Sequence, residues 1–419
     1  MGIVKPSTRR IRLALLCAAL LAVSSCAPGE YQIGSRSFSF PFGDSPPQQQ
    51  AQPIPMQQGG MMLMPVATGP SESFGRGPVK MALLLPLSGD PGTASVGMAL
   101  ANASKLAISF IEANPNIAEN ITITLRDTGP SVEGAASAAS AAVTDGAKLI
   151  LGPLRADQVT AAGAVARSAG LPLIGFSNNP NAASPGVYLL SVLPDAEMKR
   201  SLSYVRSQGR RGIAGIFPNT EFGQAQQAAF RQQAAAAGYQ PQAVYGFSGA
   251  GEAQQIVSQA LPLIQSGVID TIFLPDRASA PGFAAALQQA GLALGAVLLV
   301  GSADWQGDAA ILQSSQLSGA IYPSVDDGGL NAIAGDYQAR FGTQPHPLAT
   351  IAYTATILAN VNTLSMANPP YNPTLMLAAS GFNGRDGVFR FLGNGRSEYG
   401  LVIKQLAPGG AVTVDGVRL

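Results

Sequence analysis

The stretch from residue 79 to residue 112 constrains the fold most, because it joins a buried strand to an amphipathic helix through a short turn. Residues 81–85 are an apolar run of the length of a strand buried on both faces, and the run stops at Pro86. After a turn rich in small residues, apolar side chains recur near the 3.6-residue period as far as Ile111. A strand, a turn and a helix in this order form the first half of a βαβ unit.

The turn after this strand carries Ser88 and Asp90, a hydroxyl and a carboxylate beside the backbone N–H groups of a helix start. We expect both side chains to bind ligand, since ligands of open α/β sheets sit outside the carboxyl ends of the strands. The turn lacks the Gly-Lys-Ser/Thr of a phosphate loop and the GxGxxG of a dinucleotide site, so we expect no cofactor of either kind.

Strand-like and helix-like segments alternate from there to residue 300. Further strands are predicted at residues 121–125, 148–151, 171–175, 212–217, 243–247, 269–274 and 297–300. Helices are predicted at residues 131–145, 156–169, 197–208, 224–237, 252–264 and 281–290. Residues 188–192 are predicted to cross between two such series. The alternation favours parallel sheets with right-handed crossovers.

The last part of the chain has a different pattern. Helices are predicted at residues 330–341 and 348–365, the longer one packing back on the first series. Strands are predicted at residues 386–391, 400–406 and 412–417, with the turn signal Asn394-Gly395 between the first two.

About 340 residues of foldable sequence exceed what one hydrophobic core usually supports, so we predict an α/β fold of two lobes, each built on a doubly wound parallel sheet. Lobe 1 is predicted at residues 79–190 plus about 323–385. Lobe 2 is predicted at residues 191–322 plus about 386–419.

Residues 1–25 have the pattern of a secretory signal peptide, with basic residues, a short apolar run and two serines before Cys26. The order Leu-Ala-Val-Ser-Ser-Cys at residues 21–26 resembles a bacterial lipobox, in which the cysteine becomes the acylated first residue. The other cysteine, Cys17, lies in the removed segment, which leaves no internal disulfide. We therefore expect a lipid on Cys26, the alternative being an ordinary signal. Ala27 lacks the aspartate that retains lipoproteins in the inner membrane, which favours the outer one.

Residues 26–78 are rich in Pro and Gln and lack periodicity, which predicts a disordered tether. The whole chain has 25 basic and 24 acidic residues, a net charge of +1, so we expect no nucleic-acid partner. We expect no membrane span after residue 79, because no uninterrupted apolar run there reaches the necessary length.

Five segments in order, at residues 82–89, 145–153, 169–180, 218–224 and 386–397, resemble the leucine/isoleucine/valine-binding group of periplasmic binding proteins. The resemblance implies the type 1 fold of that family: two α/β lobes, joined by crossing strands, that close on a small ligand. Members of this kind are not enzymes. Some carry amino acids to ABC importers, and others regulate peptidoglycan synthases.

Within the group, the sequences LLLPLSG, RDTGP and LILGPL look most like the lipoproteins called penicillin-binding protein activators. In amino-acid binders of the group, hydroxyls after the third and fourth strands hold the ligand's carboxylate and ammonium. Here Arg155 and Asp157 follow the third strand, and a family threonine falls on Asn178. The family's acidic residue for the ammonium falls near Ala303, beside Asp304. These departures argue against an α-amino-acid ligand.

Two alternatives remain open for each candidate of the first lobe. Arg155 with Asp157 could bind a ligand carboxylate, or the two could pair with each other. Ser177 and Asn178 could offer a hydroxyl and an amide to a ligand, or simply form a turn.

The candidates of the second lobe are also ambiguous. Phe222 and Trp305 could cover the apolar part of a ligand, or Trp305 could belong to the core. Asp276 and Asp304 end predicted strands, where they could meet a cationic group or remain solvated.

Catalysis finds little support in the residues. His346 is the sole histidine, so no Ser-His-acid set can be assembled, and no Cys/His spacing indicates a metal. An exported hydrolase is kept only as a third class. The main hypothesis is a non-catalytic, lipid-anchored periplasmic protein that regulates peptidoglycan synthesis by binding a penicillin-binding protein, with or without a small polar ligand. The alternative is the solute receptor of an ABC importer, with its permease as partner, for amino acids, amides or small peptides.

Overall fold

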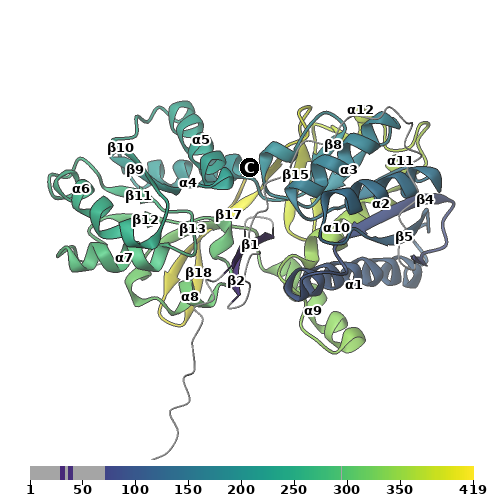
Figure 1. Ribbon diagram of the computed structural model, residues 1–419, viewed down its shortest axis with the longest axis horizontal. Helices are drawn as coiled ribbons and strands as arrows, with labels where there is room; N and C mark the ends of the chain where they lie inside the picture. Colours follow the sequence, from purple (N-terminus) through teal and green to yellow (C-terminus); the bar gives the residue numbers. More distant parts are fainter. Residues whose placement is uncertain (1–28, 34–35, 41–70, 294) are drawn as a thin grey trace, which may run out of the picture. The chain divides into compact units, whose positions relative to one another are not determined.

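The computed structural model describes residues 29–33, 36–40 and 71–419 apart from residue 294 (Figure 1). The predicted signal peptide, Cys26 and most of the predicted tether lie outside the described residues. Within that tether, β1 (Gly29–Ile33) and β2 (Arg36–Phe40) form a two-stranded sheet of their own. The alternation of Ser and Phe in β2 is a strand signal, and the prediction of a tether without periodicity took no account of it.

The sheet of the first lobe has the strand order β3-β5-β4-β6-β7-β8, and all pairs except β3–β5 are parallel. Its strands are β3 (Glu72–Phe74), β4 (Val79–Leu85), β5 (Ile121–Asp127), β6 (Ile150–Leu151), β7 (Leu173–Gly175) and β8 (Val187–Leu189). The predicted end of the tether at residue 78 is wrong, because β3 pairs with β5 and Lys105 holds Glu72 at 2.7 Å.

Helices α1 (Pro91–Ala113), α2 (Val132–Thr144) and α3 (Ala156–Ser168) belong to this lobe. Ser131, the first residue of the predicted helix 131–145, caps α2, since its hydroxyl accepts the N–H of Gly134 at 3.0 Å. By length and composition α1 would pass for a membrane span, contrary to the expectation of no such segment after residue 79. One face of α1 is buried on α10 (Ala349–Asn360), as in the core helix of a globular lobe.

The sheet of the second lobe has the order β10-β9-β11-β12-β13-β17-β18, parallel from β10 to β13 and antiparallel at β17 and β18. Its strands are β9 (Ile213–Pro218), β10 (Ala243–Phe247), β11 (Thr271–Phe273), β12 (Leu298–Val300), β13 (Ile321–Ser324), β17 (Leu401–Ala407) and β18 (Gly410–Arg418). The parallel sheets and their helices confirm the predicted α/β fold of two lobes.

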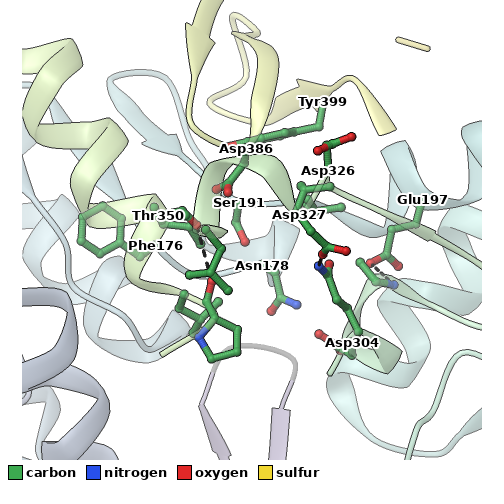
Figure 2. Close-up of a pocket in the computed structure, with 18 residues that line it drawn as sticks. Phe176, Asn178, Ser191, Glu197, Asp304, Asp326, Asp327, Thr350, Asp386 and Tyr399 are labelled. Atoms are coloured by element: carbon green, nitrogen blue, oxygen red, sulfur yellow. Dashed lines mark hydrogen bonds between the residues drawn. The ribbon is translucent and has the colours of Figure 1, made fainter. Parts of the chain in front are cut away.

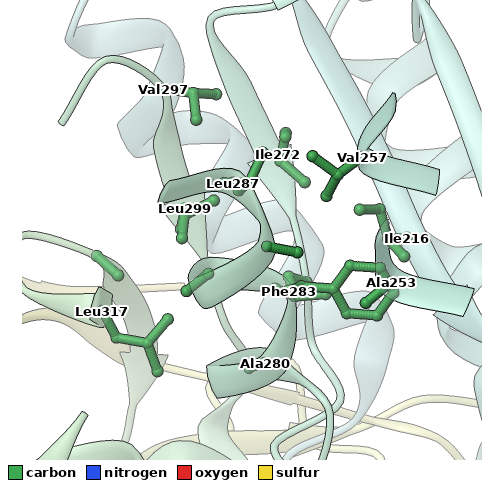
Figure 3. Close-up of a cluster of buried hydrophobic side chains, with 14 of the residues drawn as sticks. Ile216, Ala253, Val257, Ile272, Ala280, Phe283, Leu287, Val297, Leu299 and Leu317 are labelled. Carbon is green, nitrogen blue, oxygen red and sulfur yellow. The ribbon is translucent and has the colours of Figure 1, made fainter. Parts of the chain in front are cut away.

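The helices of this lobe are α4 (Pro194–Ser207), α5 (Glu221–Ala236), α6 (Ala253–Gln265), α7 (Ala280–Gln289) and α8 (Ala309–Gln313). Short 3-10 turns lie at η1 (Pro180–Ala182) in the first lobe and at η2 (Ala250–Glu252), η3 (Ala303–Trp305) and η4 (Ser315–Leu317) in the second. Figure 3 shows α6 and α7 packed on the sheet through Val257, Phe283 and Leu287, which meet Ile272 and Leu299.

Within residues 71–419, three short crossings connect the lobes: residues 190–193 after β8, residues 325–327 after β13, and Gly400 before β17. Residues 188–192 were predicted to be wholly a crossing, but β8 takes their first part as a parallel strand beside β7. Strand β13 was not predicted, because Ile-Tyr-Pro-Ser is short and contains a proline.

The remaining elements are α9 (Gly328–Phe341), α10, α11 (Asn362–Ser365), α12 (Pro373–Met376) and a small sheet of β14 (Phe382–Gly384), β15 (Gly387–Phe391) and β16 (Ser397–Tyr399). The predicted helix 348–365 is interrupted at Val361, which has a ψ of 122°. The small sheet packs on the first lobe, where Phe391 meets Tyr188 with ring centroids 5.1 Å apart. The predicted return to lobe 2 at residue 386 is therefore too early, and β17 begins it.

The turn at Asn394-Gly395 exists, but it joins β15 to β16 and not to the strand that begins at Leu401, which pairs with β13 and β18. Gly395 has a φ of +84°, and a Cβ there would lie 2.2 Å from the carbonyl oxygen of Val187. Gly395→Ala should therefore lower the free energy of unfolding by about 2–4 kcal/mol, measured in urea. Gly409→Ala is the matched control, because its φ is +88° with nothing within 4 Å, and it should cost about 1 kcal/mol. Equal losses would contradict this explanation of the turn.

Candidate functional site

A pocket lies where the three crossings meet the strand-exit loops of both lobes (Figure 2). Its cavity volume is about 90 Å³, which is room for several waters or a small solute. Ser191 and Val325 come from two of the crossings, Tyr399 precedes the third, and Asp386 lies between β14 and β15 of the small sheet. The full lining is Phe176, Asn178, Ser191, Val192, Glu197, Ala303, Asp304, Gln306, Val325, Asp326, Asp327, Leu330, Pro347, Leu348, Thr350, Ile351, Asp386 and Tyr399.

The first-lobe wall comes from the loop after β7. Asn178 is only 7% exposed, and its side-chain oxygen Oδ1 has no hydrogen-bond partner. The Ser177 hydroxyl is turned away into the loop, where it accepts the N–H of Asn179 at 3.1 Å. The Asn179 amide donates to Glu221 of α5 at 3.2 Å, which links the two lobes beside the pocket. Of the predicted pair, Asn178 lines the pocket and Ser177 supports its loop.

The second-lobe wall comes from the turn η3 after β12 and from the first turn of α4. The Ala303 N–H donates to the Glu197 carboxylate at 3.1 Å, and Asp304 lies beside them. Burial, with the nearby Asp304 carboxylate, raises the pKa of Glu197 to about 8 against the opposing effect of that N–H. Glu197 is therefore mostly protonated at neutral pH. Asp304, a candidate from the sequence, is among the residues that line the pocket.

The third wall comes from the crossings and α10. Asp327 accepts hydrogen bonds from Gln306 and from the buried ammonium of Lys404. Burial raises the pKa of Asp386 to about 6, although a hydrogen bond from Thr350 opposes the rise. Tyr399 lies next to Asp386, and burial raises the pKa of its phenol well above the usual value. The pocket thus combines buried carboxyl groups with an apolar lining.

Trp305 was predicted as a possible ligand contact, and the structure corrects this. Its ring is fully buried in the core of the second lobe, 6.2 Å from the ring of Tyr322. A Cβ on Gly301 would lie 2.2 Å from the indole, so the glycine makes room for the ring. The position after a strand end indicated a loop residue, but the 3-10 turn directs the side chain inward.

The other predicted residues also lie outside the pocket lining. Arg155 and Asp157 pair with each other at 2.8 Å, which is the structural alternative. Two more act locally: Asp90 caps α1 by accepting the N–H of Thr93, and Asp276 accepts the N–H of Ser279. Ser88 donates to Asp127 at the end of the neighbouring strand β5. Phe222 is buried at the start of α5. The bonds of Asp90 and Asp276 to backbone N–H groups three residues on are typical of aspartate in turns and at helix starts.

Several lining residues were not predicted, above all Glu197, Asp326, Asp327 and Asp386. Their signal was present in the sequence, because each lies close to a predicted lobe boundary at residue 190, 322 or 385. Segments that cross between lobes must meet at the hinge, so their polar residues were candidates. In the part of the chain that the structure describes, no three His, Cys, Asp or Glu side chains are placed to hold a metal ion.

Two α/β lobes with a ligand-sized pocket at their crossings define a two-lobe solute-binding protein. The family model for periplasmic binding proteins matches residues 78–399, and the chain belongs to that family. Membership implies a periplasmic protein. No curated protein matches the sequence.

Solved structures share the fold at low identity. A leucine-, isoleucine-, valine-, threonine- and alanine-binding protein from Brucella ovis is 18% identical with a TM-score of 0.63, covering 82% of this chain and 94% of its own. An ABC transporter substrate-binding protein from Desulfitobacterium hafniense, in complex with Leu, is 17% identical with a TM-score of 0.61, covering 80% and 99%. A solute-binding protein from Rhodopseudomonas palustris BisB5, in complex with 3,4-dihydroxybenzoic acid, is 18% identical with a TM-score of 0.58, covering 81% and 98%. One fold therefore serves chemically different ligands, and the ligand must be argued from the pocket.

Proposed function

We propose that this chain is a periplasmic receptor whose two lobes close on one small polar solute. The observation that carries the proposal is the pocket at the three crossings, with the unpartnered Oδ1 of Asn178 on its wall. A buried acceptor without a partner is costly, and a ligand N–H or O–H removes that cost on binding. The receptor does no chemistry on its ligand.

The partner in this proposal is the permease of an ABC importer. The similar solved structures include proteins described as ABC transporter substrate-binding, which supports this choice over a regulatory role. The Asn179–Glu221 bond between the lobes would stabilise the closed form that a permease recognises.

A thermal-shift screen against amino acids, amides, amines, aromatic acids and small peptides tests the receptor function. A solute at 100 times its Kd should stabilise the protein by about 2.7 kcal/mol. Asn178→Ala should weaken binding of that solute about tenfold or more, since it removes a buried acceptor. Asn331→Ala, on the exposed side of α9, is the matched control and should bind as the wild type does. If no solute shifts the wild-type protein, the proposal fails.

A second candidate is the regulation of a peptidoglycan synthase, supported by the sequences LLLPLSG, RDTGP and LILGPL. It predicts that the lipid-anchored chain captures an exported transpeptidase and changes the rate of peptidoglycan synthesis. Pull-down and synthase assays with the purified protein check both parts. No enriched synthase and an unchanged rate would leave only the importer function.

Both proposed functions include a lipid anchor on Cys26. Cys26 is proposed to carry the lipid, in the outer membrane, because the residues before it resemble a lipobox and Ala27 follows it. Cys26→Ala should move the protein from the membrane fraction to the soluble periplasmic fraction, measured by fractionation. A wild-type protein that is already soluble would contradict the anchor.

A further inference from the structure

The pocket lining is strongly acidic. Among the described residues that line it are five acids and no Lys, Arg or His; the acids are Glu197, Asp304, Asp326, Asp327 and Asp386. One of these acids is compensated: Asp327 is paired with the ammonium of Lys404, which is only 4% exposed. Figure 2 shows the labelled acids from the upper middle to the right of the view, with Phe176 and Thr350 on the left.

A second, independent observation points to a ligand that donates hydrogen bonds. Asn178 is more than nine-tenths buried, and the oxygen of its amide has no partner. It lines the same pocket from the opposite lobe to Glu197 and Asp304. An N–H of a ligand between the lobes would satisfy this oxygen and face the Asp304 carboxylate at once.

The pocket is poorly suited to bind a ligand carboxylate. The Thr350 hydroxyl already donates a hydrogen bond to Asp386, and the Gln306 amide already donates one to Asp327. Arg155, which could have held a carboxylate, is paired with Asp157 outside the pocket lining. Like charges brought together in a partly dehydrated pocket repel, so an anionic group is disfavoured.

Building on the proposed function, we propose that the ligand is a small organic cation, an amine or guanidine that carries no carboxylate. Its charged group donates to Asn178 Oδ1 and to the Asp304 carboxylate, beside the carboxyl group of Glu197. Its hydrocarbon part packs on the apolar lining supplied by Phe176, Leu330 and Ile351. The class differs from that of an α-amino acid only by the missing carboxylate.

Matched pairs of compounds test this class directly. Calorimetric titration of the mature protein compares putrescine with ornithine, cadaverine with lysine, agmatine with arginine, and 3-methylbutylamine with leucine. At least one amine should bind, and about tenfold or more tighter than its parent amino acid, because the pocket repels the added carboxylate. Amino acids that bind as tightly as their amines, or tighter, would overturn the inference and leave the receptor function intact.

A pocket variant and a matched control test whether the Asp304 carboxylate binds the charged group of the ligand. Asp304→Asn should weaken binding of the preferred amine about thirtyfold or more, as expected when one partner of a shielded charge pair is removed. Asp336→Asn, on the exposed side of α9, should leave it unchanged. Melting curves without ligand check that both variants fold, and Asn178→Ala gives a second measurement of the same site. If Asp304→Asn and Asn178→Ala both bind the amine as the wild type does, the proposed binding site is wrong.

The two failures are distinguishable. If no amine binds but a solute outside both series shifts the melting temperature, the cation inference is wrong and the receptor function holds. If nothing in the whole panel binds, the receptor function itself fails.

Discussion

Glu197→Gln should raise the free energy of unfolding at pH 9 and leave it almost unchanged at pH 5. The folded protein holds the pKa of Glu197 at about 8, against an ordinary value of 4.5. The stability that the protonated side chain contributes is fully present below pH 4.5 and is lost as the pH rises toward 8. Glutamine stays neutral at every pH, so it avoids this loss.

The size of the effect follows from the shift. Each pKa unit corresponds to about 1.4 kcal/mol, so the rise from 4.5 to about 8 predicts a gain on the order of 5 kcal/mol for the variant above pH 8. Glutamine keeps an oxygen for the Ala303 N–H, and its amide can donate to Asp304, so the fold should tolerate it.

Urea unfolding from pH 5 to pH 9 measures this difference. Glu119→Gln, in the exposed loop before β5, is the matched control and should follow the wild type throughout. Parallel pH profiles for Glu197→Gln and the wild type would show that Glu197 is ionised in the folded protein at neutral pH.

Arg200→Ala should lower the free energy of unfolding by about 3–5 kcal/mol. Arg200 lies on α4 and is only 4% exposed. Its guanidinium donates to the carbonyl of Leu401 at 2.7 Å, to Asp415 at 2.7 Å and to the carbonyl of Gly416 at 2.9 Å. The substitution leaves all three acceptors without this donor, and it loosens β17 and β18 from α4.

Arg418→Ala supplies the control, because Arg418 binds the same carboxylate of Asp415 at 3.0 Å. Its side chain is 61% exposed, so the loss should stay within about 1 kcal/mol. Denaturation in urea gives both values. Equal losses for the two arginines would show that burial adds nothing to the Arg200 interactions.

The fold was largely predictable because its signals are local. The apolar run of β4, the cap at Ser131 and the turn at Gly395 each depend on neighbours in the sequence. Errors arose where a distant segment decides the structure. Strand β3 forms only because β5 offers an edge, and β13 only because β12 and β17 flank it.

The site was predictable in part. Asn178 and Asp304 follow parallel strands, where the sequence predicted ligand contacts, and both line the pocket. Arg155 also follows a strand, but it forms an ion pair with Asp157, two residues away, and does not line the pocket. Position after a strand therefore selects candidates, and local pairing removes some of them.

The sequence by itself determined two alternating series of strands and helices, because apolar periodicity and turn residues act over a few positions. Only the tertiary structure brought Glu197, Asp326 and Asp386 around one cavity. Glu197 lies on α4, Asp326 on the crossing after β13, and Asp386 between β14 and β15, so the three residues are far apart in the sequence. Burial in the folded protein raises the pKa of Glu197 and of Asp386, which no local sequence pattern indicates.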